Sequence, residues 1–343
     1  FGKALFFYFN ILIVKLISFA DAGSDFLFTS FIPEVGYDQA LINFAFRALP
    51  VIIFFSSLIA ATYHLGIIQI IIKNIAKVME KTMKTSGAET LSISANIFVG
   101  QTEAPILIRP YISKMTNSEL MTVMVGGFST VAGSVMALYI TWLNNIPEIA
   151  GHLLAASVMS APAALMVAKI IYPETKSYQI ISSNSINLKS QDNNLVDAIG
   201  RGATDGLKLA ANVAAMLIAF ISLVAMINFI LGLLGTSMQE MLGLLFKPLA
   251  WTMGIPWADA KIVGTLMGEK IVLTELIAFR DLSDYVSNNT ISERSVIIAS
   301  YALCGFANFG SIGIQLGGIG SMAPKRKKDL SMTMYAPHER QEP

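Results

Sequence analysis

The sequence predicts an all-α membrane protein, an inverted repeat with two re-entrant helical hairpins and two interrupted transmembrane helices. Of the 343 residues, 54% are hydrophobic and only 14% are charged, whereas about 25% are charged in soluble domains. Several apolar runs are long enough to cross a bilayer. Two polar segments, around Gln101 and Glu275, each interrupt an apolar neighbourhood. The net charge of +1 argues against a nucleic-acid partner, which requires a concentrated basic face.

The chain opens with an aromatic, amphipathic run over residues 1–32, which is more typical of an interfacial helix than of a signal peptide. Because it starts with neither Met nor a basic segment, we expect it to begin partway through a longer protein. Residues 44–72 are nearly all apolar and form the first predicted span. Lysines at helical spacing then predict a basic surface helix over residues 73–85, on the cytoplasmic face.

The next apolar arms, residues 91–99 and 104–108, are each too short to cross a bilayer. They predict a first re-entrant hairpin whose helix breaks at Pro105, because proline cannot continue a helix. The span at 120–142 carries glycine and hydroxyl residues in its middle, which predicts an interrupted helix.

A full span at 153–172 and a polar linker at 173–206 come next. The order of the first part, which is full span, amphipathic segment, hairpin and interrupted span, then repeats from a long span at 207–234. Gly- and Pro-punctuated interfacial segments then extend to Asp259. The hairpin pattern returns at 262–282. The last span, 295–323, is interrupted in two places, at 304–313 and at 317–320.

Three full spans separate the two hairpins, so the second copy should lie upside down relative to the first, as in an inverted repeat. The basic residues agree with this topology. They concentrate in segments that the topology places inside, which are 73–84, 109–114, 173–206 and 325–328.

An ionisable residue at membrane depth is costly and is a functional candidate. Two inverted hairpins would bring Gln101, Thr102 and Glu103 to meet Thr274 and Glu275 at the midplane. The interrupted spans would add hydroxyl and amide groups from Thr130, Ser134, Asn308 and Ser311. Such a chamber has little fixed positive charge, so it suits a neutral solute with hydroxyl or amide groups. Its oxygens could also hold a hard cation such as Na⁺.

Structural roles are the alternative for several of these residues. Gln101 and Thr102 could cap a helix break, Glu275 could pair with Lys270 or Arg280, and Phe306 could be a core side chain. Other functional classes fit less well. An intramembrane hydrolase needs a close Asp pair or a Ser/His dyad on full spans, and a channel needs a filter repeated around one pore. We therefore expect a protein that is not an enzyme.

Two motifs carry a family resemblance. Residues Gly100–Pro105 and Ala302–Ile312 resemble the two signature motifs of concentrative nucleoside transporters, which are sodium- or proton-coupled symporters. The likeness extends over nearly all of residues 1–330. It differs at Thr274-Glu275-Leu276, where the family commonly has Asn-Glu-Phe. The family also has helices before residue 1 and a final helix after 325–328, so the chain resembles a family fragment.

The resemblance implies roles for individual residues. The nucleobase would contact Gln101, Thr102 and Glu103. The ribose would contact Glu275, Asn308 and Ser311, and the pocket lining would include Phe306 and Val135. The coupling ion, Na⁺, would be held by Asn96, Thr130 and the carbonyl groups of Val99 and Val131.

The family architecture implies a homotrimeric, elevator-type transporter that carries nucleosides inward across the cell membrane, here a bacterial inner membrane. Proton coupling is the alternative to sodium. Base preference and stoichiometry stay open. The implied division of the chain is a scaffold part (1–72), a first transport half (73–172), a cytoplasmic linker (173–206), a scaffold span (207–234), a second transport half (235–324), and a basic segment with a polar tail (325–343).

Overall fold

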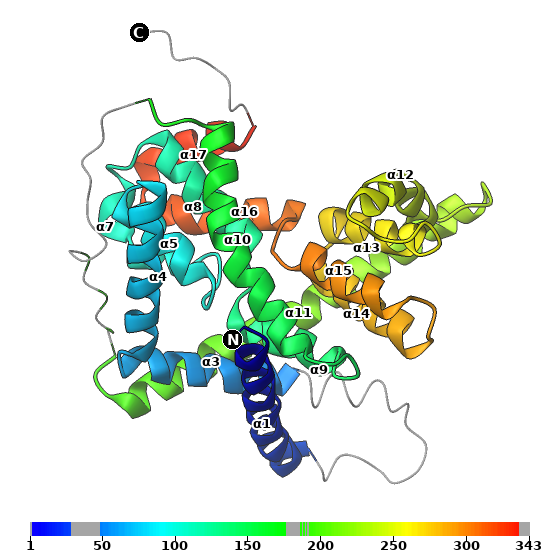
Figure 1. The fold of residues 1–343 in the computed structure, drawn as a ribbon, viewed down its shortest axis with the longest axis horizontal. Coiled ribbons are helices and arrows are strands. Elements are labelled where there is room, and N and C mark those ends of the chain that lie inside the picture. Colours follow the sequence, from blue (N-terminus) through cyan, green and yellow to red (C-terminus); the bar gives the residue numbers. More distant parts are fainter. Residues whose placement is uncertain are drawn as a thin grey trace. The chain divides into compact units, whose positions relative to one another are not determined.

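The computed structural model describes residues 2–28, 49–175, 186, 188, 190 and 192–335, and this part of the chain is helical without strands. Figure 1 shows the helices in chain order. They belong to two compact units. Unit 1 comprises Phe1–Ala61, Ser134–Leu154 and Asp192–Leu303, and unit 2 comprises Thr62–Gly133, Ala155–Gln191 and Cys304–Pro343. The expected all-α fold is confirmed.

Within the described ranges, two helical segments are long and apolar enough to cross a membrane, Asn117–Trp142 and Ile149–Ile171. A bent pair of helices, Pro50–His64 and Ile67–Met83, passes the same test as a broken span or re-entrant loop. The first predicted span, 44–72, is therefore wrong as a single helix. Gly66 has a φ of 83°, a left-handed conformation that glycine adopts easily, and it separates the two helices. Residues 29–48 lie outside the described part.

Unit 1 contains α1 (Gly2–Phe28) and most of α3 (Leu49–His64). Both segments are long and apolar. Such runs form helices in a membrane because a helix satisfies its own backbone hydrogen-bonding groups. Their packing is apolar: Ile13, Leu16 and Ile17 of α1 lie against buried Val51 and Phe55 of α3. The expected helix over the start of the chain is present in the described residues.

The rest of unit 1 holds the second hairpin. In α13 (Ala260–Val272) and α14 (Glu275–Ser287), the break falls at Leu273–Thr274, inside the predicted hairpin. Thr274 begins α14 because its hydroxyl accepts a hydrogen bond from Ile277 N at 3.4 Å. The other helices of unit 1 are α9 (Gly133–Trp142), α11 (Leu195–Gly232), α12 (Met238–Thr252) and α15 (Glu293–Leu303).

Two of these elements differ from the expected boundaries. The segment predicted as Gly- and Pro-punctuated contains α12, a continuous helix with Pro248 inside it. The helix α11 starts at Leu195, within the predicted linker, because the Asn194 side chain accepts from Asp197 N at 2.9 Å. It then covers nearly all of the predicted span 207–234.

Unit 2 holds the basic helix α4 (Ile67–Met83) and the first hairpin. The hairpin comprises α5 (Gly87–Asn96), α6 (Glu103–Leu107) and α7 (Arg109–Ile112). The expectation that the helix breaks at Pro105 is wrong. The helix stops at Asn96, and Pro105 is the third residue of α6, where its missing N–H would have no helical acceptor. Ser86 and Glu89 form a capping box that starts α5.

The remaining helices of unit 2 confirm both interrupted helices. The helix α8 (Asn117–Ser129) stops at Thr130, and α16 (Phe309–Met322) starts after an irregular segment at 304–308. The second predicted interruption, at 317–320, is wrong, since α16 runs through it. Gly318 does not break the helix but leaves space for Thr102, because a Cβ at Gly318 would lie 3.0 Å from Thr102 Cγ2.

The unit closes with α10 (Ile149–Ile171, from Ala155), the 3₁₀ turn η4 (Pro324–Arg326) and α17 (Lys327–Tyr335). The predicted polar tail is therefore helical as far as residue 335, and residues 336–343 lie outside the described part. Arg326 anchors this end through hydrogen bonds to Met115 O at 2.5 Å and Asn117 Oδ1 at 2.8 Å. In the core, Ile93 and Ile97 pack against Ala161 and Leu165 of α10.

Candidate functional site

The tip of the first hairpin meets the start of α16 in unit 2. The Gln101 side chain is 8% exposed, and its Nε2 donates to Ser311 Oγ at 3.2 Å. Its Oε1 accepts from Gln315 Nε2 at 3.0 Å. Both ends of the Gln101 amide are thus held by α16, and its orientation is fixed. The structure brings together Gln101 and Ser311, two residues that the sequence predicted as substrate contacts.

Gln315 is a buried residue that is not among those predicted from the sequence. It is fully buried, and its Nε2 also donates to Met124 O of α8 at 3.1 Å. A lone glutamine in an apolar helix was the available signal, because a buried amide requires partners. Gln315 therefore positions Gln101 and joins the hairpin tip to α8.

Asn308 and Phe306 precede α16 in the irregular segment. Asn308 is the N-cap residue, and its Oδ1 accepts from Ser311 N at 2.8 Å. Phe306 is half-buried. Gly305 has a φ of 124° and packs directly against the backbone at the end of α8. A Cβ at Gly305 would be 2.7 Å from Phe128 O. Only glycine permits this close approach with that φ, and it places the Phe306–Ser311 segment beside α8.

Thr102 and Glu103 complete the hairpin tip. Thr102 occupies the N-cap position of α6, but its side chain makes no capping hydrogen bond, and the Gln101 amide is used by α16. The capping alternative for these two side chains is therefore not what the structure shows. Glu103 is exposed, and its carboxylate folds back toward Gly100.

The residues expected around a sodium ion also lie in unit 2. Asn96, the last residue of α5, is fully buried, and neither its Oδ1 nor its Nδ2 has a hydrogen-bond partner within the described structure. Thr130 ends α8, and its hydroxyl donates to Gly126 O at 3.1 Å. A Cβ at that same Gly126 would lie 3.5 Å from Asn96 Nδ2. The two predicted ligands therefore flank one glycine.

A backbone hydrogen bond joins the two chain segments that follow Asn96 and Thr130. Gly133 N donates to Phe98 O at 3.0 Å, so the loop after α5 pairs with the break after α8. Val99 and Val131, whose carbonyl groups were predicted ligands, lie in these two segments, Val99 half-buried and Val131 fully buried. Backbone carbonyls released by a helix break are common cation ligands.

Glu275 and Val135 lie in unit 1. Glu275 is the first residue of α14 and 4% exposed, and its Oε1 accepts from Tyr139 OH at 3.3 Å. The Tyr139 ring stacks on Phe279 with centroids 4.0 Å apart. Val135 is buried on α9, the helix that carries Tyr139. Tyr139, which holds the Glu275 carboxylate, is not among the residues predicted from the sequence.

Lys270, in the last turn of α13 before the second hairpin tip, donates to Ala302 O at 2.9 Å. In unit 2, the Lys169 ammonium lies 2.8 Å from Glu89 Oε2 and 3.0 Å from Ser118 Oγ. This pair, of which Glu89 is buried and Lys169 half-buried, ties the start of the first hairpin to α8 and α10. Among the described residues no group of three or more His, Cys, Asp or Glu side chains could hold a metal ion.

Comparison with known protein families identifies two regions. Residues 152–336 match the model of the family described as Na+ dependent nucleoside transporter C-terminus, and residues 45–145 match one described as nucleoside recognition. The first of these covers more than half of the chain.

Curated relatives agree. The chain is 43% identical over 339 residues to sodium/nucleoside cotransporter 1 of Mus musculus, covering 92% of this chain and 50% of that protein. It is 42% identical over 338 residues to the uncharacterized transporter YutK of Bacillus subtilis (strain 168), covering 96% of this chain and 81% of that protein. The chain thus spans about half the length of the animal relatives it matches.

Solved structures give the same result at the level of fold. The chain resembles CNTnw in an inward-facing substrate-bound state with a TM-score of 0.87 and 41% identity, over 97% of this chain and 80% of that one. A CNTnw variant in an outward-facing state gives 0.88 and 40% over the same shares. With relatives that are membrane transporters, this is a multi-pass integral membrane protein, and the chain belongs to the Na⁺-dependent nucleoside transporter family.

Proposed function

We propose that this chain forms a sodium-coupled symporter that carries nucleosides into the cell. Family membership supports the proposal, as do the names of relatives such as sodium/nucleoside cotransporter 1. The observation that carries it is the buried Asn96 amide, which has no hydrogen-bond partner among the described residues and lies in the same unit as the fixed Gln101 amide. An unpaired buried amide costs about 1–3 kcal/mol, so its retention at this position suits a ligand-binding role.

The donor set around Asn96 fits Na⁺. A hard cation takes neutral oxygen ligands, and Asn96 Oδ1 is a buried oxygen that lacks a donor in the described structure. Thr130 uses its hydroxyl hydrogen on Gly126 O, which leaves its oxygen able to face a cation. These two side chains, with the carbonyl groups of Val99 and Val131, would hold the ion. Bound there, Na⁺ supplies positive charge that fixes the backbone just before Gln101.

The nucleoside would be held by groups that the protein orients in advance. Gln101, Thr102 and Glu103 would take the base, with Gln101 already fixed by Ser311 and Gln315. The ribose hydroxyls would contact Ser311, Asn308 and Glu275, and Tyr139 would orient the Glu275 carboxylate. Phe306 and Val135 would line the pocket.

The transport cycle would be elevator-like, with residues 73–172 and 235–324 forming a mobile transport domain and residues 1–72 and 207–234 a scaffold. Similar chains support this cycle, since CNTnw structures include inward-facing, outward-facing and intermediate states. The assembly would be a homotrimer in the bacterial inner membrane, with residues 173–206 as its cytoplasmic linker and 325–343 as its basic end.

Uptake of radiolabelled uridine and adenosine into proteoliposomes tests the function. An inward sodium gradient should accelerate uptake at least several-fold over an equal choline gradient. Uptake that ignores sodium but follows an inward proton gradient would assign the protein to proton coupling instead. A protein that binds neither nucleoside would contradict the substrate class.

Sodium and nucleoside should each raise the other's affinity by the same factor, because coupling free energy is reciprocal. Asn96→Ala should weaken nucleoside binding mainly at low sodium, with partial recovery at high sodium. The matched control is Ser94→Ala on the same helix, since the partners of Ser94 Oγ in the described part of the chain are Thr90 O and Met79 Sδ. Calorimetric titration of both variants over a range of sodium concentrations measures the effect. An equal loss in both would remove Asn96 from the ion site.

A further inference from the structure

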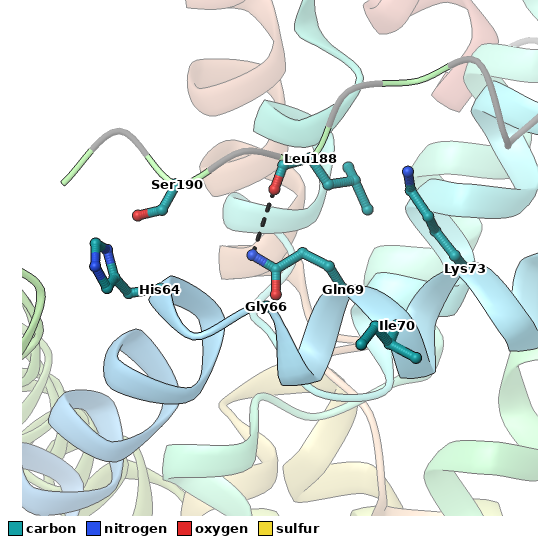
Figure 2. Close-up of a pocket in the computed structure, with 7 residues that line it drawn as sticks. All are labelled: His64, Gly66, Gln69, Ile70, Lys73, Leu188 and Ser190. Carbon is teal, nitrogen blue, oxygen red and sulfur yellow. Dashed lines mark hydrogen bonds between the residues drawn. The ribbon is translucent and has the colours of Figure 1, made fainter. Parts of the chain in front are cut away.

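A pocket of about 350 Å³ lies beside the start of α4 in unit 2. Figure 2 shows its walls. Leu188 and Ser190 come from the segment after α10, and the other lining residues come from the end of α3 and the first two turns of α4. None of them belongs to the proposed transport site. The lining residues are His64, Gly66, Gln69, Ile70, Lys73, Leu188 and Ser190.

The Gln69 amide has a defined orientation. Its Nε2 donates to Leu188 O at 3.3 Å and to Tyr63 O, so the other end of the amide must be the oxygen. Gln69 is 9% exposed, and its Oε1 is buried without a partner in the described ranges. His64 Nδ1 is also buried and has no hydrogen-bond partner among the described residues. The pocket therefore presents a buried acceptor that requires a hydroxyl or N–H donor.

The same pocket is positively charged. Lys73 lines it and makes no ion pair with the residues that the structure describes. The helix α4 begins there after Gly66, which supplies no side-chain cap for the first N–H groups. These groups add partial positive charge at the helix start. A ligand that satisfies both features carries an anionic group together with hydroxyls, as a phosphate ester of glycerol does.

The rim of the pocket is apolar and exposed. Leu65 is 59% exposed, Ile67 48% and Ile70 64%, next to lysines that the charge distribution places at the cytoplasmic interface. Such a rim suits acyl chains, which a soluble phosphate ester lacks. We propose that this pocket binds the headgroup of an anionic, hydroxylated phospholipid of the phosphatidylglycerol type, with its phosphate at Lys73 and the start of α4 and a hydroxyl donating to Gln69 Oε1.

Native mass spectrometry of the full 343-residue chain in detergent, titrated with dioctanoyl phosphatidylglycerol, tests the cation. Lys73→Gln should weaken binding about 10-fold through loss of a charge-assisted contact, and Lys73→Arg should retain most of it. Lys77→Gln is the matched control, because Lys77 is exposed on the same helix and does not line the pocket. An equal loss in Lys73→Gln and Lys77→Gln would reduce the effect to surface charge and overturn the site.

The unmutated protein tests the ligand without any risk of misfolding. Dioctanoyl phosphatidylmethanol has the same charge but no headgroup hydroxyl, so it should bind several-fold more weakly than dioctanoyl phosphatidylglycerol. Dioctanoyl phosphatidylcholine should bind more weakly still. Equal binding of the first two lipids would remove the role of Gln69. If glycerol 3-phosphate bound as tightly as the lipid, the pocket would belong to a soluble phosphate ester.

Discussion

At the scale of single residues, the orientation of Gln101 depends on Gln315. Donors and acceptors run in order from Gln315 Nε2 to Gln101 Oε1, and from Gln101 Nε2 to Ser311 Oγ. Gln315 itself is directed by Met124 O. An amide presented to a substrate is selective only when its two ends cannot exchange, and this chain of hydrogen bonds prevents the exchange.

Gly127 of α8 makes room for that amide, because a Cβ there would overlap Gln315 Nε2 and lie 3.1 Å from Gln101 Cβ. We expect Gly127→Ala to displace both side chains and raise the nucleoside KM about 5- to 30-fold, which corresponds to about 1–2 kcal/mol. The control is Gly317→Ala, whose added methyl would meet nothing within 4 Å. Initial rates of uridine uptake at saturating sodium measure both. Equal KM values for the two variants would contradict the role of Gln315.

The site residues were predictable from sequence only where a polar residue interrupts an apolar segment. Glu103 and Gln101 are polar residues in an apolar segment and are predicted on that ground, whereas the role of Asn96 comes from the family resemblance. Gln315 and Tyr139 are not predicted because each lies among apolar residues in a helix, outside the polar segments that mark the hairpin tips. Their roles depend on which side chain lies opposite, and that information is in the packing rather than in the spacing.

At the scale of elements, α12 and α13 pack side by side (Figure 1), and glycines lie where the two helices meet. A Cβ at Gly264 would lie 2.8 Å from both Gly243 O and Lys247 N, and one at Gly268 would lie 2.6 Å from Leu242 Cβ. The two glycines are one helical turn apart. Small residues at this spacing let helix backbones approach each other in membranes.

We expect Gly264→Ala to destabilise the protein by about 1–3 kcal/mol, because the methyl would meet backbone atoms that cannot move aside. Gly200→Ala in α11 is the control. A Cβ there meets nothing within 4 Å, and the change should be neutral or stabilising by up to about 1 kcal/mol. Thermal unfolding in detergent distinguishes them: similar midpoints would show that the α12–α13 contact tolerates a larger residue.

Element types were predictable from sequence, and their limits were not. Both hairpins and both interrupted helices follow from short apolar arms next to polar or glycine-rich segments. Pro105 was misread because proline is compatible with the first turn of a helix as well as with its end. The glycines at 317–320 lie inside α16 because glycine also serves close helix packing, and Pro248 lies inside α12 rather than ending it.

At the scale of the whole molecule, the distribution of lysine and arginine predicts which ends of the helices face the cytoplasm. The helix α11 offers a test with matched positions, since Val196 is 78% exposed and Leu234, just after its other end, is 77% exposed. Cys304, the single native cysteine, is buried and can be replaced by serine.

In a Cys304→Ser background, Leu234→Cys should react with a membrane-impermeant maleimide in intact cells. Val196→Cys should react only in inverted membrane vesicles. Gel-shift quantification of the labelled fraction measures both. Labelling with the reverse sidedness would show that the charge distribution misassigns the orientation.

The length of α11 has a consequence for the lipid around it. Its 38 residues extend about 57 Å at 1.5 Å per residue. Its first turns carry charge: Arg201 donates hydrogen bonds to Asp192 at 2.6 Å and to Asp205 at 3.3 Å, and the hydrogen bond that Asp192 accepts raises the pKa of Arg201. The uncharged remainder, residues 209–232, measures about 36 Å, against a hydrocarbon thickness of about 30 Å.

This hydrophobic mismatch is relieved by tilting in an average bilayer and disappears in a thicker one. The tilt of α11 is therefore expected to follow acyl-chain length, which oriented-sample spectroscopy in bilayers of graded thickness would detect, and an unchanged tilt would exclude.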